Sequence, residues 1–93
     1  MKEQSLIEQV KSYLNGYPGL FYWKEHGGIY GTAGIPDIII CYQGRFIALE
    51  CKSKNRKPTV LQQITINKIN RAGGTAVVVY CLDEVKELLK QFK

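Results

Sequence analysis

Two carboxylates and one ammonium group are the side chains of this chain whose types and spacing could do chemistry. Asp37 stands just before one apolar run, Glu50 and Lys52 stand at the end of a second one, and a glutamine-glycine pair separates the runs. Both runs are rich in β-branched and aromatic residues, so the stretch is predicted to form a β-hairpin. Because side chains alternate along a strand, Glu50 and Lys52 project from the same face.

Antiparallel pairing of this hairpin would place Asp37 beside Glu50 and Lys52, at the open end of the two strands. Two carboxylates held together raise each other's pKa unless a cation lies between them. Oxygen ligands select hard divalent cations such as Mg²⁺ or Mn²⁺, and Mg²⁺ is usually held by one or two carboxylates together with water and substrate phosphate. The pattern therefore predicts a metal site, with a phosphodiester as the substrate class.

A run of basic residues follows the second strand directly. The segment 52–57 carries four positive charges, of which Lys54, Arg56 and Lys57 lie beyond the strand. Such a run can hold the phosphates of a duplex through counterion release, without reading base sequence. A charge run alone is more typical of solvated surface. Its position beside the acids is what favours a contact with DNA.

A glycine-rich stretch, residues 26–35, comes before Asp37 and carries Tyr30 and Thr32. Its freedom to bend would let these two side chains approach a phosphate backbone, although the stretch can equally be a plain connector. No GxGxxG or Walker pattern is present, so no nucleotide cofactor is expected. His26 is the only histidine and is interpreted as a loop residue, which leaves no histidine-based zinc site.

The first element is predicted to be a helix over residues 2–15, because apolar residues recur there at spacings of three and four. Extending the apolar face by one turn reaches Glu3, which could face the interior. Glu3 can also be explained as a first-turn acid favoured by the helix dipole. Glu8 points away from that face, and with Ser5 it fits a capping box.

A second helix is predicted over residues 59–72, between the basic run and a pair of glycines. Thr59 and Gln62 form a capping-box pattern at its start. Gln62 also shares a stripe with Ile66 and Ile69, which places its amide on the buried side of the helix. The amide could orient a catalytic group there, or it could serve the cap alone.

The remaining elements complete an α/β pattern. A short aromatic strand is predicted over 20–25, a valine-rich strand with both faces covered over 75–80, and a last helix from Asp83. The order is then αβββαβ with an extra C-terminal helix. A strand-helix-strand step implies a right-handed crossover and a parallel pair, so we expect a mixed sheet flanked by helices.

Length, charge and cysteine content limit the number of domains, the class of partner and the compartment that can be expected. The 93 residues predict a single domain over 1–93, and so small a catalytic domain would benefit from pairing with a second copy. Thirteen Lys and Arg against eight Asp and Glu give a net charge of +5, which favours polyanionic partners. Three cysteines without a CxxC motif are interpreted as buried apolar residues of a reducing compartment. No signal segment or membrane span is apparent, so a soluble cytoplasmic protein is expected.

The motifs together resemble those of a known nuclease family. Pro36-Asp37, twelve residues, and then Glu50-Cys51-Lys52 resemble the PD-(D/E)XK signature. The details are similar to VRR-NUC domains, which share a GxPD opening, a T-x-x-Q pattern and a closing glycine pair. These motifs stand here in the segments 34–37, 59–62 and 73–74. The loop before Gly34 departs from the family pattern, because residues 24–26 match its basic or asparagine position only loosely.

The resemblance implies a restriction-endonuclease-like core and hydrolysis of DNA phosphodiesters with Mg²⁺ or Mn²⁺. It implies that Asp37, Glu50 and the backbone carbonyl of Cys51 hold the metal, and that Lys52 and Gln62 act in catalysis. Glu3 lies where these domains often place a first-helix glutamate, which implies a role through a second water shell.

Stand-alone VRR-NUC proteins of phage and bacterial type are similar to Holliday-junction resolvases in acting as dimers on branched DNA. Archaeal junction resolvases share an E-x-K-S pattern, which residues 50–53 match. The expected function is therefore a structure-selective endonuclease acting as a homodimer on branched or duplex DNA. The alternatives are a nicking or flap nuclease, a non-catalytic basic DNA-binding module and a protein-interaction domain.

Overall fold

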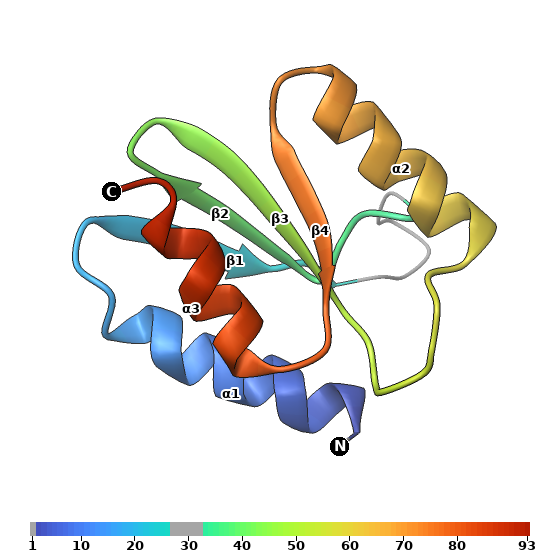
Figure 1. Ribbon diagram of the computed structural model, residues 1–93, viewed down its shortest axis with the longest axis horizontal. Coiled ribbons are helices and arrows are strands. Elements are labelled where there is room, and N and C mark those ends of the chain that lie inside the picture. The colour runs from blue at the N-terminus through green and yellow to red at the C-terminus, as the bar shows by residue number, and fades with distance from the viewer. Residues whose placement is uncertain (1, 27–32) are drawn as a thin grey trace.

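Seven elements make up the part of the chain that the computed structural model describes, residues 2–26 and 33–93. Their bounds are α1 Glu3–Asn15, β1 Leu20–Lys24, β2 Ile38–Tyr42, β3 Arg45–Cys51, α2 Val60–Arg71, β4 Thr75–Val79 and α3 Leu82–Lys90. The predicted αβββαβ order with an extra C-terminal helix is confirmed (Figure 1). Within those residues, no helix has both the length and the apolar character needed to cross a membrane.

One mixed sheet of four strands organises the molecule, in the order β1-β2-β3-β4. The first three strands are antiparallel, and β4 pairs parallel to β3 after the crossover through α2. The predicted hairpin is present, with Tyr42 opposite Arg45. Its turn residues Gln43 and Gly44 both have positive φ, 53° and 72°, as the tight type I′ turn between twisted strands requires.

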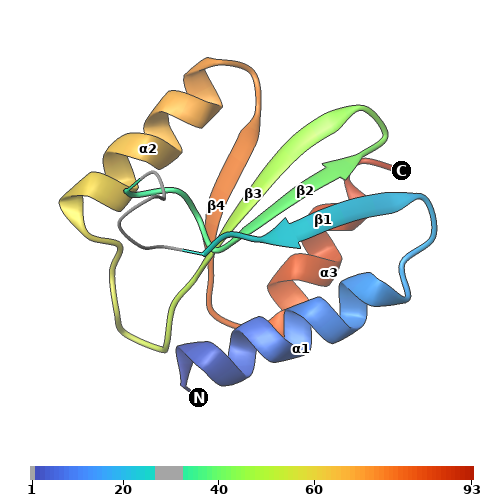
Figure 2. The same ribbon diagram turned by 180° about the vertical axis from the view of Figure 1, so that it is seen from behind.

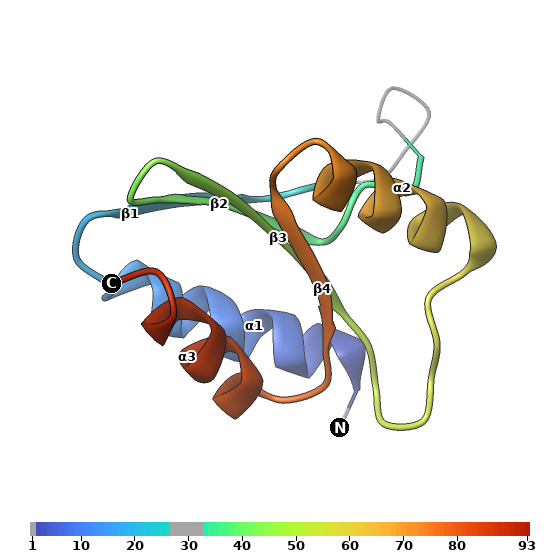
Figure 3. The same cartoon turned by 45° about the horizontal axis from the view of Figure 1, so that its top comes forward.

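The helices cover the two faces of the sheet unequally. Helices α1 and α3 lie on one face and α2 alone lies on the other (Figures 2 and 3). The larger core lies under α1 and α3, and its buried residues are Leu6, Ile7, Val10, Leu14, Ile38, Ile40, Tyr42, Ile47, Leu49, Cys51, Val79, Val85 and Leu89. Among the described residues, the core under α2 has four buried members, Ile39, Ala48, Ile66 and Ala76. Helix α2 therefore covers only part of that second face.

Of the two predicted capping boxes, the one at α2 is confirmed and the one at α1 is wrong. At α2 the Thr59 side chain accepts from the Gln62 backbone N–H, and the Gln62 side chain accepts from the Thr59 N–H. Helix α1 instead begins at Glu3, so Ser5 lies inside its first turn and cannot cap it. Glu8 accepts a hydrogen bond from Gln4 and forms a surface ion pair with Lys11.

The prediction that all three cysteines are buried holds only for Cys51. Cys41 and Cys81 are exposed, and all three thiols are free. Cys41 projects from β2 on the face that carries α2, at a position that the helix does not cover. Cys81 lies at the N-cap of α3, outside both cores.

Candidate active site

The structure brings Asp37, Glu50 and Lys52 together at one end of the hairpin, and we call these three residues the acidic centre. Continuing the β2–β3 register by one residue places Asp37 opposite Glu50. Alternation puts Glu50 and Lys52 on the face that carries α2. Both are almost fully buried, with 2% and 7% of their surfaces exposed. Charged side chains are rarely buried this deeply, which marks this end of the sheet as a candidate site.

The Asp37 carboxylate is held by the backbone of the neighbouring strand. Its Oδ2 atom accepts a hydrogen bond of 2.8 Å from the Cys51 N–H. The paired register of β2 and β3 ends at Ile38 and Leu49, so Cys51 lies beyond the last β2 partner of its strand. Pro36, next to Asp37, has no N–H that could extend this ladder.

Glu50 is the most perturbed group of the acidic centre. One of its oxygens, Oε2, lies 3.8 Å from the Lys52 ammonium, while the other, Oε1, is buried without a hydrogen-bond partner among the described residues. Burial raises the pKa of Glu50 to about 8, and the nearby Asp37 carboxylate adds to the rise. Lys52 lowers this pKa and Glu3 raises it slightly. In the metal-free protein Glu50 therefore keeps its proton at neutral pH, and a bound cation would favour its release.

Glu3 approaches this site from α1, whereas Glu8 does not. The Glu3 carboxylate is near enough to raise the pKa of both Glu50 and the Cys51 thiol, and it is only partly exposed. Glu8 is exposed and is paired with Lys11 on the outer side of the helix. Of the two acids in α1, the structure therefore brings Glu3 to the acidic centre.

Two residues near the site were not assigned to it from the sequence. Lys24 lies close enough to lower the pKa of the Cys51 thiol, which burial and then Asp37 raise to about 12. Its ammonium donates to the Glu25 carbonyl at 2.7 Å, and the Glu25 N–H donates to the Asp37 carbonyl at 2.8 Å. The β1–β2 register, which only the fold defines, is the signal that identifies them.

The Gln62 side chain takes part in the capping box of its own helix, α2. Its side-chain oxygen accepts from the Thr59 N–H at 2.9 Å, so only the amide nitrogen remains for a role in chemistry. Among the described residues no hydrogen bond joins Gln62 to Lys52 or to either acid. The structural role of Gln62 is thus established, and its catalytic role stays a prediction.

Gly34 fixes how the segment that carries Asp37 enters the sheet. Its φ of 85° lies in the left-handed region, and a Cβ atom there would lie 2.7 Å from Thr65 Oγ1 and 3.0 Å from Leu61. Only glycine allows this close approach to α2. The GxPD opening is therefore a packing requirement that positions Asp37.

The basic loop, residues 53–57, lies beyond the acidic centre and is open to solvent. Lys54, Arg56 and Lys57 are exposed, and together with Tyr80 they line a hollow of about 420 Å³. The Tyr80 hydroxyl donates to the Arg56 carbonyl at 3.0 Å. Tyr80 was not predicted to be near this loop, because it follows β4, far along the chain. Tyr30 and Thr32, also predicted to contact DNA, lie outside the described residues.

The ligand set of the acidic centre suits a metal that needs few protein ligands. Across the described segments, no group of three or more His, Cys, Asp or Glu side chains is arranged to hold a metal ion. Two carboxylates and the neighbouring Cys51 backbone carbonyl are present instead. Mg²⁺ commonly binds to such small oxygen sets and completes its octahedron with water and phosphate. The unpartnered Glu50 oxygen and its raised pKa fit a cation at this point.

Two solved structures resemble the chain over nearly its whole length. One, a VRR_NUC domain, matches with a TM-score of 0.79 at 22% sequence identity, covering 100% of this chain and 99% of that one. The chain has the VRR_NUC fold. The other, a VRR_NUC domain protein, matches with a TM-score of 0.77 at 20% identity, covering 99% of this chain and 88% of that one.

At these identities the likeness concerns the VRR_NUC fold, and it agrees with the α/β architecture expected from the motifs. No protein-family model matches the sequence, and no curated protein matches it either. The chemistry of the site therefore has to be argued from its residues.

Proposed function

We propose that this chain is a metal-dependent nuclease that hydrolyses DNA phosphodiesters at the acidic centre. The observation that carries the proposal is the environment of Glu50, which is buried near Asp37, with one oxygen that has no hydrogen-bond partner in the described part of the chain and a pKa raised to about 8. A site serving only stability would gain by replacing such a group with an apolar one. A site for a divalent cation requires it.

Asp37, Glu50 and the Cys51 carbonyl would hold Mg²⁺ or Mn²⁺. Such a metal, when bound, polarises the scissile phosphate and lowers the pKa of a bound water. The Lys52 ammonium, kept in place by its contact with Glu50, would stabilise negative charge that develops on the phosphate oxygens. Glu3 would act on the centre through water, and Gln62 through its free amide nitrogen.

DNA is the proposed substrate, and the basic loop is its proposed contact. Its exposed cations follow the acidic centre directly in the chain, so they could hold phosphates of a DNA strand whose scissile phosphate lies at that centre. The net charge of +5 supports the same partner. We further propose selectivity for branched DNA, with a homodimer placing paired nicks in a four-way junction.

A non-catalytic DNA-binding module is the competing function, and the exposed basic loop alone would satisfy it. It does not explain why two carboxylates lie beside a phosphate-binding surface, where they oppose binding. It also leaves the burial of Glu50 and Lys52 without a purpose. A protein that only binds DNA through the same loop would bind it more tightly without the acidic centre.

Substitution of Asp37 tests the hydrolytic proposal. Asp37→Asn keeps an oxygen that can accept from the Cys51 N–H but loses the charge, so the fold is retained and cleavage should fall to background. Binding to DNA should persist or tighten, because a negative charge near phosphate is removed. The measurement is cleavage of labelled junctions, flaps, splayed arms and linear duplexes with and without Mg²⁺ or Mn²⁺.

Glu87→Gln is the matched control, since it removes one exposed carboxylate on α3, on the opposite face of the sheet, and should cleave like wild type. Wild-type cleavage by Asp37→Asn in either metal would refute the assignment. A wild-type protein that binds these substrates and cuts none of them would favour the binding module.

A further inference from the structure

The two edge strands of the sheet, β4 and β1, differ in whether side chains bind their outward-pointing backbone groups. At the β4 edge, the groups that point outwards belong to Ala76, Val78 and Tyr80, because Val79 faces β3, where its carbonyl accepts from Lys52. The Asn70 side chain binds both backbone groups of Ala76, accepting from its N–H at 2.7 Å and donating to its carbonyl at 3.1 Å.

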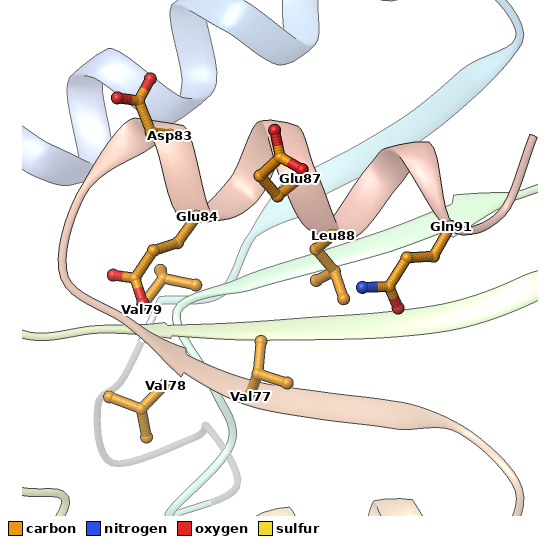
Figure 4. Close-up of a pocket in the computed structure, with 8 residues that line it drawn as sticks. All are labelled: Val77, Val78, Val79, Asp83, Glu84, Glu87, Leu88 and Gln91. Carbon is orange, nitrogen blue, oxygen red and sulfur yellow. The ribbon is translucent and has the colours of Figure 1, made fainter.

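Glu84 closes the other end of this edge. Its Oε1 atom accepts from the Tyr80 N–H at 2.7 Å, and Figure 4 shows its side chain reaching from α3 towards the end of β4. Val78 is the one outward position of the strand between these two caps. Side chains of this molecule thus occupy the β4 edge at both ends, which prevents another strand from pairing there.

The β1 edge has no such protection within the described residues. The Glu25 N–H donates to the Asp37 carbonyl, so Phe21 and Trp23 also direct their backbone groups to β2. The backbone groups of Leu20, Tyr22 and Lys24 therefore point outwards. This row of unpaired donors and acceptors is a template for a further strand.

The side chains at the β1 edge are of a type that is common at protein–protein interfaces. Phe21 and Trp23 are 65% and 45% exposed, and their ring centroids lie 6.2 Å apart on the face that α2 leaves open. On this face, β1 and β2 carry no lysine or arginine, because Lys24 projects towards the other side. Exposed paired aromatics without basic neighbours favour a protein partner over a phosphate backbone.

We propose that β1 pairs antiparallel with β1 of a second copy, about a two-fold axis at Tyr22. This register is self-complementary: Leu20 faces the partner's Lys24, the two Tyr22 residues face each other, and every outward backbone group finds a partner. It also sets Phe21 beside the partner's Trp23, a cross-strand aromatic pair that occurs twice. The two sheets become one continuous sheet.

The pairing has a consequence for the proposed nuclease, on whose dimer it rests. A two-fold axis perpendicular to the sheet keeps both acidic centres on the same face. With strands about 4.8 Å apart and about 3.4 Å per residue, the two centres would lie roughly 30 Å apart along a diagonal. One branched DNA molecule could then meet both.

Light scattering after size-exclusion chromatography, over a range of concentrations, tests the interface. Wild type should approach dimer mass as its concentration rises. Phe21→Lys should remain a monomer, because the substitution removes both aromatic contacts with the partner's Trp23 and buries a lysine on either side of the axis. Phe46→Lys is the matched control: Phe46 is 47% exposed on the same face but lies on β3, away from the edge, so this variant should dimerise.

Amide hydrogen exchange gives a second readout. The amides of Leu20, Tyr22 and Lys24 should exchange at least about tenfold more slowly when wild type is concentrated, and this protection should be absent in Phe21→Lys. A monomeric wild type, unprotected amides in a dimer, or a dimer broken by Phe46→Lys and kept by Phe21→Lys would each overturn the β1 interface. None of these results bears on hydrolysis, which the Asp37 variant tests separately.

Discussion

The acidic centre and the basic loop are consecutive in the chain, yet they lie in opposite environments. Lys52 is 7% exposed and lies beside the buried Glu50, whereas Lys54, two residues later, is exposed to solvent. Both are lysines that the proposed function places near DNA phosphates. The difference shows that the chain passes from a buried to an exposed environment within two residues of the end of β3, so the two lysines can be expected to have different roles.

Burial decides how strongly each group acts. In the acidic centre the charges interact through a medium of low polarity, so contacts at 3.8 Å are strong and the pKa of Glu50 moves far from its ordinary value. In the basic loop the charges interact through water and are screened by salt. The same substitution, made once in the acidic centre and once in the basic loop, should therefore have different effects on cleavage and on binding.

The largest expected effect separates the two lysines. Lys52→Ala should lower the single-turnover cleavage rate by about 10²-fold or more, because it removes a fixed charge beside the reacting phosphate. Lys54→Ala should leave that rate unchanged and reduce the slope of log affinity against log salt by about 0.9, the loss of one phosphate contact. Rapid-quench kinetics and salt-dependent binding measure the two quantities.

Calorimetric titration with Mn²⁺ is the control for this pair. Lys52→Ala should bind the metal about as well as wild type, since the ammonium is not a ligand. If Lys54→Ala slows the chemical step as much as Lys52→Ala does, the distinction between the two regions is wrong.

A smaller effect concerns stability and pH. The pKa of Glu50 is about 8 in the folded protein against 4.5 for the free side chain. Between these values the folded protein keeps a proton that the unfolded chain has released. The free energy of unfolding of the metal-free protein should therefore fall as pH rises from 4.5 to 8, by at most about 1.4 kcal/mol per pH unit from this group.

Glu50→Gln cannot ionise, so denaturant titrations of this variant should lack that fall. Mg²⁺ or Mn²⁺ should stabilise wild type, most strongly near pH 8, because a cation compensates the carboxylate, and should not stabilise Glu50→Gln to the same extent. Identical pH profiles for the two proteins would show that Glu50 does not have the raised pKa.

The smallest expected effect concerns Gln62, between the two regions. Gln62→Ala should cost about 1 kcal/mol of stability through loss of the capping box. Gln62→Glu keeps the oxygen that accepts from Thr59 and loses the amide nitrogen, so it should be as stable as wild type but slower in cleavage. Equal cleavage rates for Gln62→Glu and wild type would show that Gln62 serves only the capping box of α2.

Much of the fold could be predicted because its signals are local. The turn at Gln43-Gly44, the alternation along β3 and the capping box at Thr59 each depend on a few neighbouring residues. The box expected at Ser5 failed because α1 begins at Glu3, after an N-cap at Lys2, which places Ser5 inside the first turn, as the helix predicted over 2–15 already implied. The prediction that Cys41 is buried failed because its exposure depends on where α2 lies on the sheet.

The site was predicted in part. Asp37, Glu50 and Lys52 follow from strand alternation and one hairpin register, both readable in the sequence. Tyr80 was missed, and Lys24 was noted only as part of a loose match to a family position, because they approach the site through β1 and β4, whose pairing no short pattern reveals. The unequal edges of the sheet were missed as well, since Asn70 and Glu84 become edge caps only when their helices are docked.

The sequence by itself determined which chemical groups this chain can offer and which of them share a strand face, because period-two alternation and tight turns act over a few residues. Only the tertiary structure decided how those groups behave. The proton affinity of Glu50 depends on exclusion of water by the packed sheet and on charges brought in from α1 and β2. Burial and long-range proximity arise when segments far apart in sequence pack together, and no local pattern contains them.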